Sequence, residues 1–228
     1  NGAPMGAMLR QHYWLPAIPS SKLEAGGRPF RVRLLGIDLV VFRGPDGGVG
    51  VLDERCPHRK ASLALARNEP GGLRCIYHGW KLAASGAVVE APNHTGDQER
   101  FCAHVRTRRY RAVDRGGIVW AWLGEGETPA RFPELPFVDL PESQRAVTSA
   151  QVPTNWVQGV EASMDSSHVS VLHESSTQMT AGAGNQRLLM NRAIAPKLEF
   201  EERPYGYRYA ALRPAGDEQV YARVNNFV

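Results

Sequence analysis

The stretch Cys56-Pro57-His58 and its counterpart Cys75-Ile76-Tyr77-His78-Gly79-Trp80, after sixteen intervening residues, decide how this chain folds. They supply two thiols and two imidazoles in the order Cys, His, Cys, His. Zinc and iron-sulfur clusters both accept such ligands. A common zinc finger groups its cysteines in one loop and its histidines on a helix. Here each loop supplies one ligand of each kind, so two facing loops can give both cysteines to one iron of a 2Fe-2S cluster and both histidines to the other.

The two boxes resemble those of Rieske proteins, because the four ligand types, their order and the trailing Gly79-Trp80 all agree. A zinc site or an unrelated set of residues remains the alternative. The resemblance implies that a Rieske 2Fe-2S cluster is bound by Cys56, His58, Cys75 and His78.

The branch of this family follows from residues beside the ligands. Respiratory Rieske proteins have two further cysteines, which form a disulfide across the cluster loops. This chain has Arg59-Lys60-Ala61 after the first histidine and Tyr77 before the second, so that disulfide is impossible. The resemblance therefore points to the oxygenase or ferredoxin branch.

Composition indicates a globular protein of one large or two modest domains, with 228 residues, 43% hydrophobic and 22% charged. Of three cysteines only Cys102 is left over, and we interpret it as a small buried hydrophobe. A cytoplasmic, reducing setting is expected because no disulfide framework exists. Without a long apolar run or a signal-like N-terminus, we expect a soluble protein with no membrane partner.

The net charge of +4 does not predict a nucleic-acid partner, because the basic residues are scattered and no aromatic-rich basic motif accompanies them. One local group of arginines falls within an expected strand. Alternation makes most of this group a solvated face, and a docking site for a reductase is the less favoured interpretation. The group comprises Arg106, Arg108, Arg109 and Arg111.

The first part of the chain has the pattern of an all-β domain. Short runs rich in Val, Leu and Phe alternate with turns containing Gly, Pro and Asp. The expected strands cover residues 30–35, 39–43, 49–52 and 72–76, with a hairpin of residues 104–113 and 118–123. The Pro-rich stretch from Pro129 to Pro141 is typical of a domain boundary. We place the border near residue 140, which predicts domains at 1–140 and 141–228.

A second informative stretch runs from Asn155 to His173 and predicts a helix, because few strong breakers interrupt it. Glu161, Asp165 and His168 have the spacing i, i+4 and i+7 and would share one face. His173 lies five residues beyond His168, about 140° around an ideal helix. Both imidazoles can bind one metal only if the helix bulges or ends between them.

Two neutral imidazoles and a carboxylate are the ligands of a non-haem Fe(II) oxygenase, whose iron keeps positions open for dioxygen and substrate. A pair of histidines is by itself a weak signal. The upstream cluster motif strengthens it, because a one-electron donor and a dioxygen-binding iron in one chain form a coherent redox enzyme.

Together the motifs resemble the oxygenase (alpha) subunit of Rieske non-haem iron aromatic ring-hydroxylating oxygenases. Asn155-Trp156, Gln158, Glu161 and Asp165-Ser166-Ser167-His168 are most similar to the phthalate dioxygenase branch, which includes monooxygenases and O-demethylases. The resemblance implies an α+β fold, with an N-terminal all-β Rieske 2Fe-2S domain followed by the start of an α+β catalytic domain of the helix-grip type.

The resemblance also assigns the second site. His168 and His173 would bind the mononuclear iron, and Asp165 would be the bridging aspartate that hydrogen-bonds toward a cluster histidine of a neighbouring subunit. A homo-oligomer, commonly a trimer, is thus implied. The carboxylate iron ligand of the family lies further along, whereas this sequence stops at Val228 in a stretch that still predicts a strand. We therefore expect an incomplete chain and assign that ligand to neither Glu161 nor Asp165.

The function implied is that of an oxygenase component. It would receive electrons from NAD(P)H through a separate flavin and iron-sulfur reductase and use O2 to hydroxylate or oxidatively demethylate an aromatic substrate. An anionic arene is the preferred substrate class. The alternative is a Rieske-type electron-transfer protein without oxygenase activity, which would need only the first motif.

Overall fold

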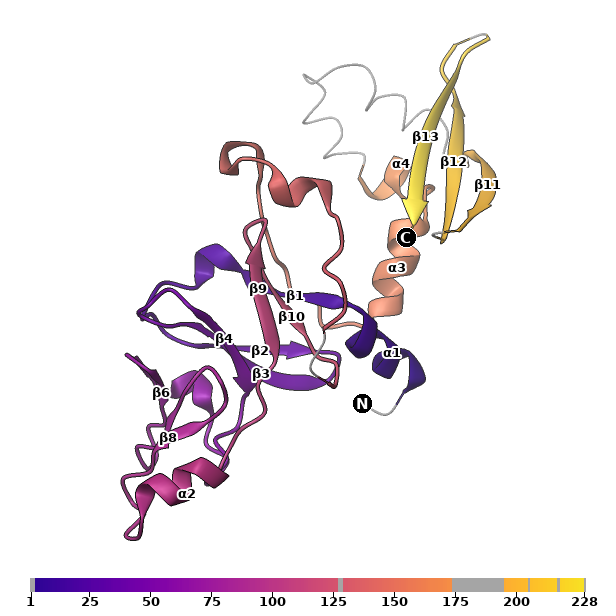
Figure 1. Cartoon of the computed structure of the whole chain (residues 1–228). Helices are drawn as coiled ribbons and strands as arrows, with labels where there is room; N and C mark the ends of the chain where they lie inside the picture. Colours follow the sequence, from indigo (N-terminus) through magenta and orange to yellow (C-terminus); the bar gives the residue numbers. More distant parts are fainter. Residues whose placement is uncertain (1–2, 127–128, 174–194, 205, 217, 228) are drawn as a thin grey trace. The chain divides into compact units, whose positions relative to one another are not determined.

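The computed structural model describes residues 3–126, 129–173, 195–204, 206–216 and 218–227. The chain divides into two compact units, residues 1–150 and 151–228, which are coloured along the sequence in Figure 1. The division falls within the segment that follows the Pro-rich stretch, somewhat later than the border near residue 140. Each unit is described by itself below.

The first unit is predominantly β. Its helices are α1 (Pro4–His12) and α2 (Gln98–His104). Its strands are β1 (Trp14–Pro19), β2 (Phe30–Leu34), β3 (Ile37–Arg43), β4 (Val49–Asp53), β5 (Arg67–Glu69), β6 (Gly72–Arg74), β7 (Lys81–Leu82), β8 (Val88–Glu90), β9 (Arg111–Arg115) and β10 (Ile118–Trp122). They form antiparallel sheets in the orders β1-β10-β9, β2-β3-β4 and β5-β6-β7-β8.

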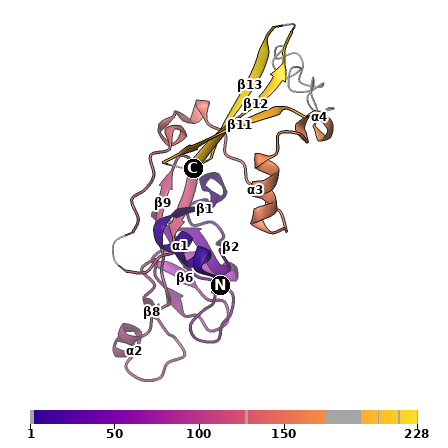
Figure 2. The same ribbon diagram turned by 90° about the vertical axis from the view of Figure 1, so that its right-hand side faces the viewer.

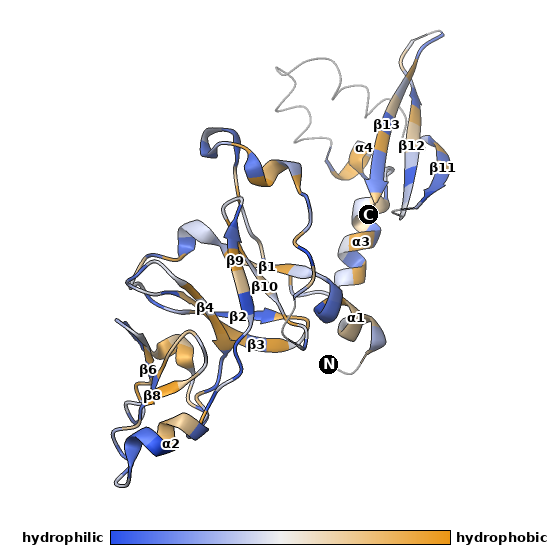
Figure 3. Cartoon of the chain, in the orientation of Figure 1, coloured by the Kyte–Doolittle hydropathy of each residue, from blue (hydrophilic) through white to orange (hydrophobic). Residues whose placement is uncertain are grey.

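Strand β3 is buried on both faces and lies at the centre of this unit. Leu39 and Val41 belong to one hydrophobic cluster, whereas Val40 and Phe42 belong to the cluster that contains the two cysteines of the ligand boxes. Successive strand residues point to opposite faces, so one strand serves both cores. This double burial explains the hydrophobic colour of β3 in Figure 3. Each such side chain contributes about 1.5–3 kcal/mol to folding.

Strands deliver both ligand boxes, as the sequence predicts. The first box follows β4 and the second follows β6. Strands β6 and β8 and helix α2 gather at one end of the unit, at the lower left of Figure 1. Leu63, Leu73 and Trp80 pack there with Cys56 and Cys75, so the ligand loops rest on a hydrophobic core.

The strand expected at residues 104–113 was wrong in its first half. His104 ends α2 instead, and β9 begins only at Arg111. The Asp97 side chain caps α2 by accepting a hydrogen bond from the Arg100 N–H at 3.0 Å. Phe101 and Cys102 of this helix pack against the core, so tertiary contacts and an N-cap override the alternating pattern. The turn between β9 and β10 at Gly116-Gly117 was predicted correctly.

The second unit combines helices with one sheet (Figures 1 and 2). Its described elements are α3 (Trp156–Met164), α4 (Val169–Leu172), β11 (Lys197–Arg203), β12 (Gly206–Pro214) and β13 (Val220–Phe227). The strands pair antiparallel in the order β11-β12-β13. Strand β13 confirms the strand predicted near the end of the sequence. Together the two units have the predicted α+β fold.

The single helix predicted from Asn155 to His173 was wrong. The helix ends at Met164, and a new short helix begins after His168. The break falls on Asp165-Ser166-Ser167, residue types whose side chains compete with helical hydrogen bonds and favour turns. Glu161, Asp165 and His168 therefore do not share one helix face.

No helix within the described residues is long and apolar enough to cross a membrane.

Substituting Gly72 should disrupt the sheet that carries the second ligand loop. Gly72 has φ of +144°, and a Cβ there would lie 2.1 Å from the Leu82 carbonyl oxygen on β7. We expect Gly72→Ala to cost about 3 kcal/mol and to lower the thermal unfolding midpoint measured by circular dichroism. Gly47 has φ of +85° and open space around it, so Gly47→Ala should cost only about 1 kcal/mol. Equal losses in the two variants would contradict this explanation.

Candidate metal centres

The first ligand loop is closed by two backbone hydrogen bonds. The Cys56 N–H donates to the Ala61 carbonyl at 2.9 Å, and the Lys60 N–H donates to the Cys56 carbonyl at 3.0 Å. Lys60 has φ of +59°. A left-handed backbone is costly for a residue with a side chain, so the closed loop holds Lys60 in place against this preference.

The second ligand loop repeats this closure with the same spacing. The Cys75 N–H donates to the Trp80 carbonyl at 2.8 Å, and the Gly79 N–H donates to the Cys75 carbonyl at 3.0 Å. Gly79, with φ of +74°, occupies the place that Lys60 has in the first loop. The trailing glycine of the second box thus has a conformational role, because glycine adopts this backbone without strain.

The four predicted cluster ligands lie together at the tips of these loops. Cys56 and Cys75 are 1% and 2% exposed, and both thiols are free. Burial and the neighbouring Cys75 thiol raise the pKa of Cys56 to about 11. The rings of His58 and His78 lie 4.5 Å apart between centroids. The Nδ1 atom of His58 is buried and has no hydrogen-bond partner among the described residues, as expected of a nitrogen kept for a metal.

The arrangement pairs the ligands by kind, as a two-iron cluster requires. The Cys75 thiol interacts with that of Cys56, and the His58 and His78 rings lie beside each other. Structural zinc needs four ligands around one centre. In a Rieske cluster each iron takes only two protein ligands, either two cysteines or two histidines.

Aromatic rings support the imidazole of His58. Trp80 stacks on it with a centroid distance of 4.6 Å and an interplanar angle of 5°. The Trp80 indole N–H donates to the Asn93 Oδ1 at 2.6 Å, and the edge of Phe101 contacts Trp80 with centroids 5.5 Å apart. These contacts fix the plane of a ligand ring and cover the indole from water, which explains the tryptophan of the second box.

An ion-pair network behind the second loop was missed by the sequence analysis. Arg74 donates to Glu69 at 2.8 Å, to Glu90 at 2.7 Å and to the Gly79 carbonyl at 2.9 Å. Hydrogen bonding to Arg74 lowers the pKa of both carboxyl groups. Glu69 and Arg74 lie five residues apart across the β5–β6 hairpin, whereas Glu90 reaches Arg74 only because β8 belongs to the same sheet, which the sequence pattern did not predict.

The second candidate centre contains the predicted iron histidines. His168 and His173 flank the single turn of α4, with ring centroids 5.3 Å apart and planes at 64°. The sequence analysis required the helix to bulge or end between the two histidines, and α4 does end at Leu172. A further break, which was not expected, precedes His168, because Asp165 starts a turn there. The short helix α4 then brings the rings close to each other.

The Asp165 carboxylate organises this turn. Its Oδ1 accepts from the Ser167 N–H at 2.7 Å, and its Oδ2 accepts from the His168 backbone N–H at 3.3 Å. The backbone bond from Ser167, and then the bonds from His168, lower the pKa of Asp165. Oδ2 also lies 3.1 Å from His168 Nδ1. A hydrogen on Nδ1 leaves Nε2 as the ligand atom, a common role of carboxylates behind metal-binding histidines.

A carboxylate ligand for this iron was not identified in the sequence, and the described residues do not provide one. Glu161 is exposed on α3. The two histidines still fit part of a site with two histidines and one carboxylate.

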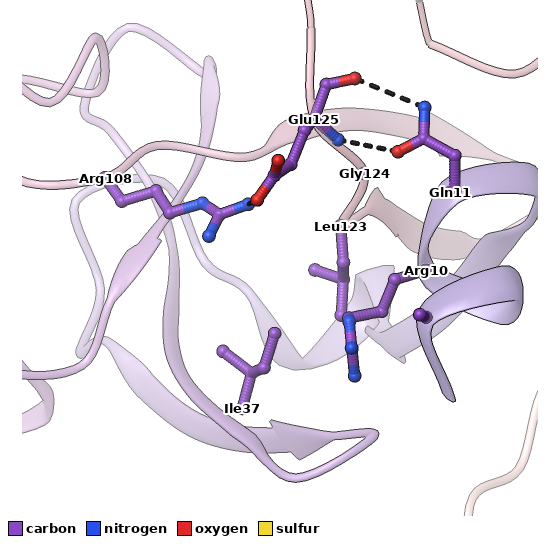
Figure 4. Close-up of a pocket in the computed structure, with 8 residues that line it drawn as sticks. Arg10, Gln11, Ile37, Arg108, Leu123, Gly124 and Glu125 are labelled. Atoms are coloured by element: carbon purple, nitrogen blue, oxygen red, sulfur yellow. Dashed lines mark hydrogen bonds and ion pairs between the residues drawn. The ribbon is translucent and has the colours of Figure 1, made fainter. Parts of the chain in front are cut away.

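A surface cavity of about 570 Å³ lies elsewhere in the first unit. Figure 4 shows Arg10 and Gln11 of α1 facing Leu123, Gly124 and Glu125 across it. The Gln11 amide donates to the Glu125 carbonyl at 3.2 Å and accepts from the Glu125 N–H at 2.9 Å. Its described lining includes no predicted ligand, so it is not part of either centre.

Comparison with protein families matches two successive parts of the chain. The Rieske [2Fe-2S] domain family matches residues 13–110, and the family described as LigXa C-terminal domain like matches residues 121–228. The first match includes all four predicted cluster ligands. The second includes Asp165, His168 and His173.

Curated relatives are similar over almost the whole chain. The 3-chlorobenzoate-3,4-dioxygenase oxygenase subunit of Comamonas testosteroni is 40% identical over 100% of this chain and 52% of its own length. The phthalate 4,5-dioxygenase oxygenase subunit of Pseudomonas putida is 39% identical over 92% of this chain and 49% of its own length. The chain thus spans about half the length of the curated relatives it matches.

A solved structure has a similar fold. The terminal oxygenase of carbazole 1,9a-dioxygenase from Nocardioides aromaticivorans IC177 matches with a TM-score of 0.67 and 21% identity, covering 93% of this chain and 56% of that one.

The network around Arg74 predicts a specific acid sensitivity. A carboxyl group whose pKa is lowered on folding stabilises the protein above its ordinary pKa of about 4.3 and loses this contribution as the pH falls through the lowered value. We expect the unfolding midpoint to fall as the pH decreases below about 5. Arg74→Met should lower the midpoint at pH 7 and flatten its dependence on acid, measured by thermal denaturation across pH.

The matched control is Arg67→Met. Arg67 also contacts Glu69, at 3.3 Å, but its side chain is 68% exposed, so its removal should have little effect. Identical acid profiles for the two variants would exclude the Arg74 network as the cause.

Proposed function

Because the chain belongs to the Rieske oxygenases, we propose that it is the Rieske and iron-histidine portion of an oxygenase subunit that hydroxylates or oxidatively demethylates an aromatic substrate with O2. One observation carries this proposal: a single chain holds a four-ligand cluster set and, separately, a carboxylate-supported histidine pair. These sets are Cys56, His58, Cys75 and His78, and Asp165, His168 and His173.

The second set distinguishes an oxygenase from an electron carrier. A Rieske-type electron-transfer protein needs only the cluster loops. It has no use for two further imidazoles, one of which is hydrogen-bonded to a carboxylate. The match of residues 121–228 to a family beyond the Rieske domain favours the oxygenase as well.

The residues of the chain have separable roles in this proposal. When bound, the cluster supplies single electrons and the mononuclear iron supplies a site where dioxygen is activated. Cys56 and Cys75, which are buried in the core, would hold one iron of the cluster, and His58 and His78 would hold the other. Asp165 keeps the His168 proton on Nδ1 and so directs Nε2 toward the iron.

The family resemblance supports the proposed partners. Electrons would come from NAD(P)H through a flavin and iron-sulfur reductase. The oxygenase would be a homo-oligomer, a trimer or a multiple of it, in which Asp165 accepts a hydrogen bond from a cluster histidine of a neighbouring subunit. An anionic arene is the proposed substrate class, since the similar subunits are named for chlorobenzoate and phthalate.

Metal analysis of the full-length protein tests the proposal directly. We expect acid-labile sulfide, about three irons per chain, and a Rieske EPR signal after reduction with dithionite. Two irons per chain with an intact cluster signal would support the electron-carrier alternative. Zinc without sulfide would overturn both the oxygenase hypothesis and the electron-carrier hypothesis.

Replacing Asp165 should separate metal binding from turnover. Asp165→Asn keeps one oxygen acceptor but loses the second, so we expect both metal centres to be filled when Fe(II) is supplied in excess, and turnover of this loaded variant to fall by at least about tenfold. Substrate-dependent oxygen uptake and iron content are the measurements. Glu161→Gln, one helical turn earlier on an exposed face, is the control and should leave turnover unchanged. Normal turnover of a fully loaded Asp165→Asn variant would remove the bridge assignment.

A further inference from the structure

The turn that carries the iron histidines is held by side chains of β12. Alternate residues of this strand point to one face of the sheet, and Tyr207, Tyr209 and Arg213 share it. The Tyr207 hydroxyl contacts the Met164 sulfur at the end of α3. The strand and the turn lie more than forty residues apart in sequence, so the contact is purely tertiary.

Tyr209 holds the turn at two points. Its hydroxyl donates to the Met164 carbonyl at 2.6 Å and lies 3.0 Å from the Ser166 Oγ. The last carbonyls of a helix have no partner within that helix, so a side chain must satisfy those that are buried. Tyr209 is 2% exposed and Ser166 is 3% exposed. This part of the turn is therefore fixed inside the unit.

Arg213 of β12 is a buried charged residue that contacts the turn. It is 1% exposed, and its Nη2 donates to the Ser166 carbonyl at 2.7 Å. Its Nε and Nη1 have no hydrogen-bond partner among the described residues. Burial lowers its pKa, and the nearby Arg223 charge adds to this. A buried guanidinium without a carboxylate partner is costly, whereas an apolar side chain would fill the same place more favourably.

Within the described parts of the chain, the hydrogen bond of Arg213 ends on the residue next to Asp165. Ser166 lies between the carboxylate that accepts from His168 and the Ser167 N–H that donates to that carboxylate. Movement of the Ser166 carbonyl would therefore turn the Asp165 side chain and the imidazole that depends on it. A cation near the C-terminal end of α3 is also favoured by the helix dipole.

We propose that Arg213 and Tyr209 are positioning residues of the iron site, which fix the Met164–Ser166 backbone from beneath and thereby set the direction of the His168 imidazole. This inference rests on the proposed function, because it concerns the same iron. It adds a role for two residues that lie outside the ligand set and come from a separate strand.

The experiment measures Fe(II) binding by the full-length enzyme, using competition with a chelator and the EPR spectrum of the ferrous nitric oxide complex. Arg213→Met should bind Fe(II) about 10- to 100-fold more weakly and change that spectrum, while the Rieske signal is unchanged. Arg213→Lys should restore affinity, because a lysine can make the one hydrogen bond to the Ser166 carbonyl. A lysine variant as weak as the methionine variant, or a methionine variant equal to wild type, overturns the proposal for Arg213.

Tyr209→Phe is the second variant, because it removes one oxygen and leaves the ring in the core, so it should fold even if Arg213→Met does not. It should also weaken Fe(II) binding, and wild-type affinity in this variant overturns the shared role. Arg208→Met is the matched control, since Arg208 points to the other face of β12 and pairs with Glu201. It should bind iron normally. Wild-type enzyme without mononuclear iron would instead overturn the proposed function itself.

Discussion

Each of the two cluster loops is closed by an equivalent pair of backbone hydrogen bonds. The architecture of the first unit depends on bringing these two closed loops face to face. The closure fixes the backbone on either side of a cysteine and leaves the histidine free to extend from the tip. Ligands held in this way need little rearrangement when an electron arrives. Closure of the loop by these hydrogen bonds also explains why each loop contains one residue with a left-handed backbone, Lys60 in the first and Gly79 in the second.

The hydrophobic core beneath the two ligand loops consists of two clusters that share one strand. Strand β3 is buried on both faces, so it joins the hydrophobic cluster under the cysteines to the cluster formed with β10. Arg74 then ties the Gly79 carbonyl to carboxylates of two other strands. The second loop therefore rests on a rigid apolar core, and the ion pairs of Arg74 with carboxylates on neighbouring strands hold its Gly79 carbonyl.

In the second unit, hydrogen bonds also hold the turn that carries the predicted ligands, but they come from different groups. A local carboxylate, Asp165, accepts hydrogen bonds within the turn, and β12 supports the same turn from below. In both units the predicted ligand residues lie outside regular helices and strands, while Trp80 in the first unit and Tyr209 and Arg213 in the second, which support them, are buried. Loss of hydrogen-bonded support of this kind commonly lowers metal affinity or activity by about 10- to 100-fold.

The sequence alone predicted the candidate metal ligands, because thiols and imidazoles at a fixed spacing are typical of metal-binding loops. It also predicted the strands that lead to the loops, since alternating apolar residues and Gly-rich turns are local signals, whereas the α+β class was implied by the family resemblance. Tertiary structure decided where helices begin and end: the N-cap at Asp97 and the turn at Asp165 each prevailed over a longer regular pattern. It alone placed Arg74 beside its two carboxylates and Arg213 beneath Ser166. The Arg213 contact joins residues far apart in the chain, and the Arg74 contacts depend on how β5, β6 and β8 pair, so neither leaves a periodic trace in the sequence.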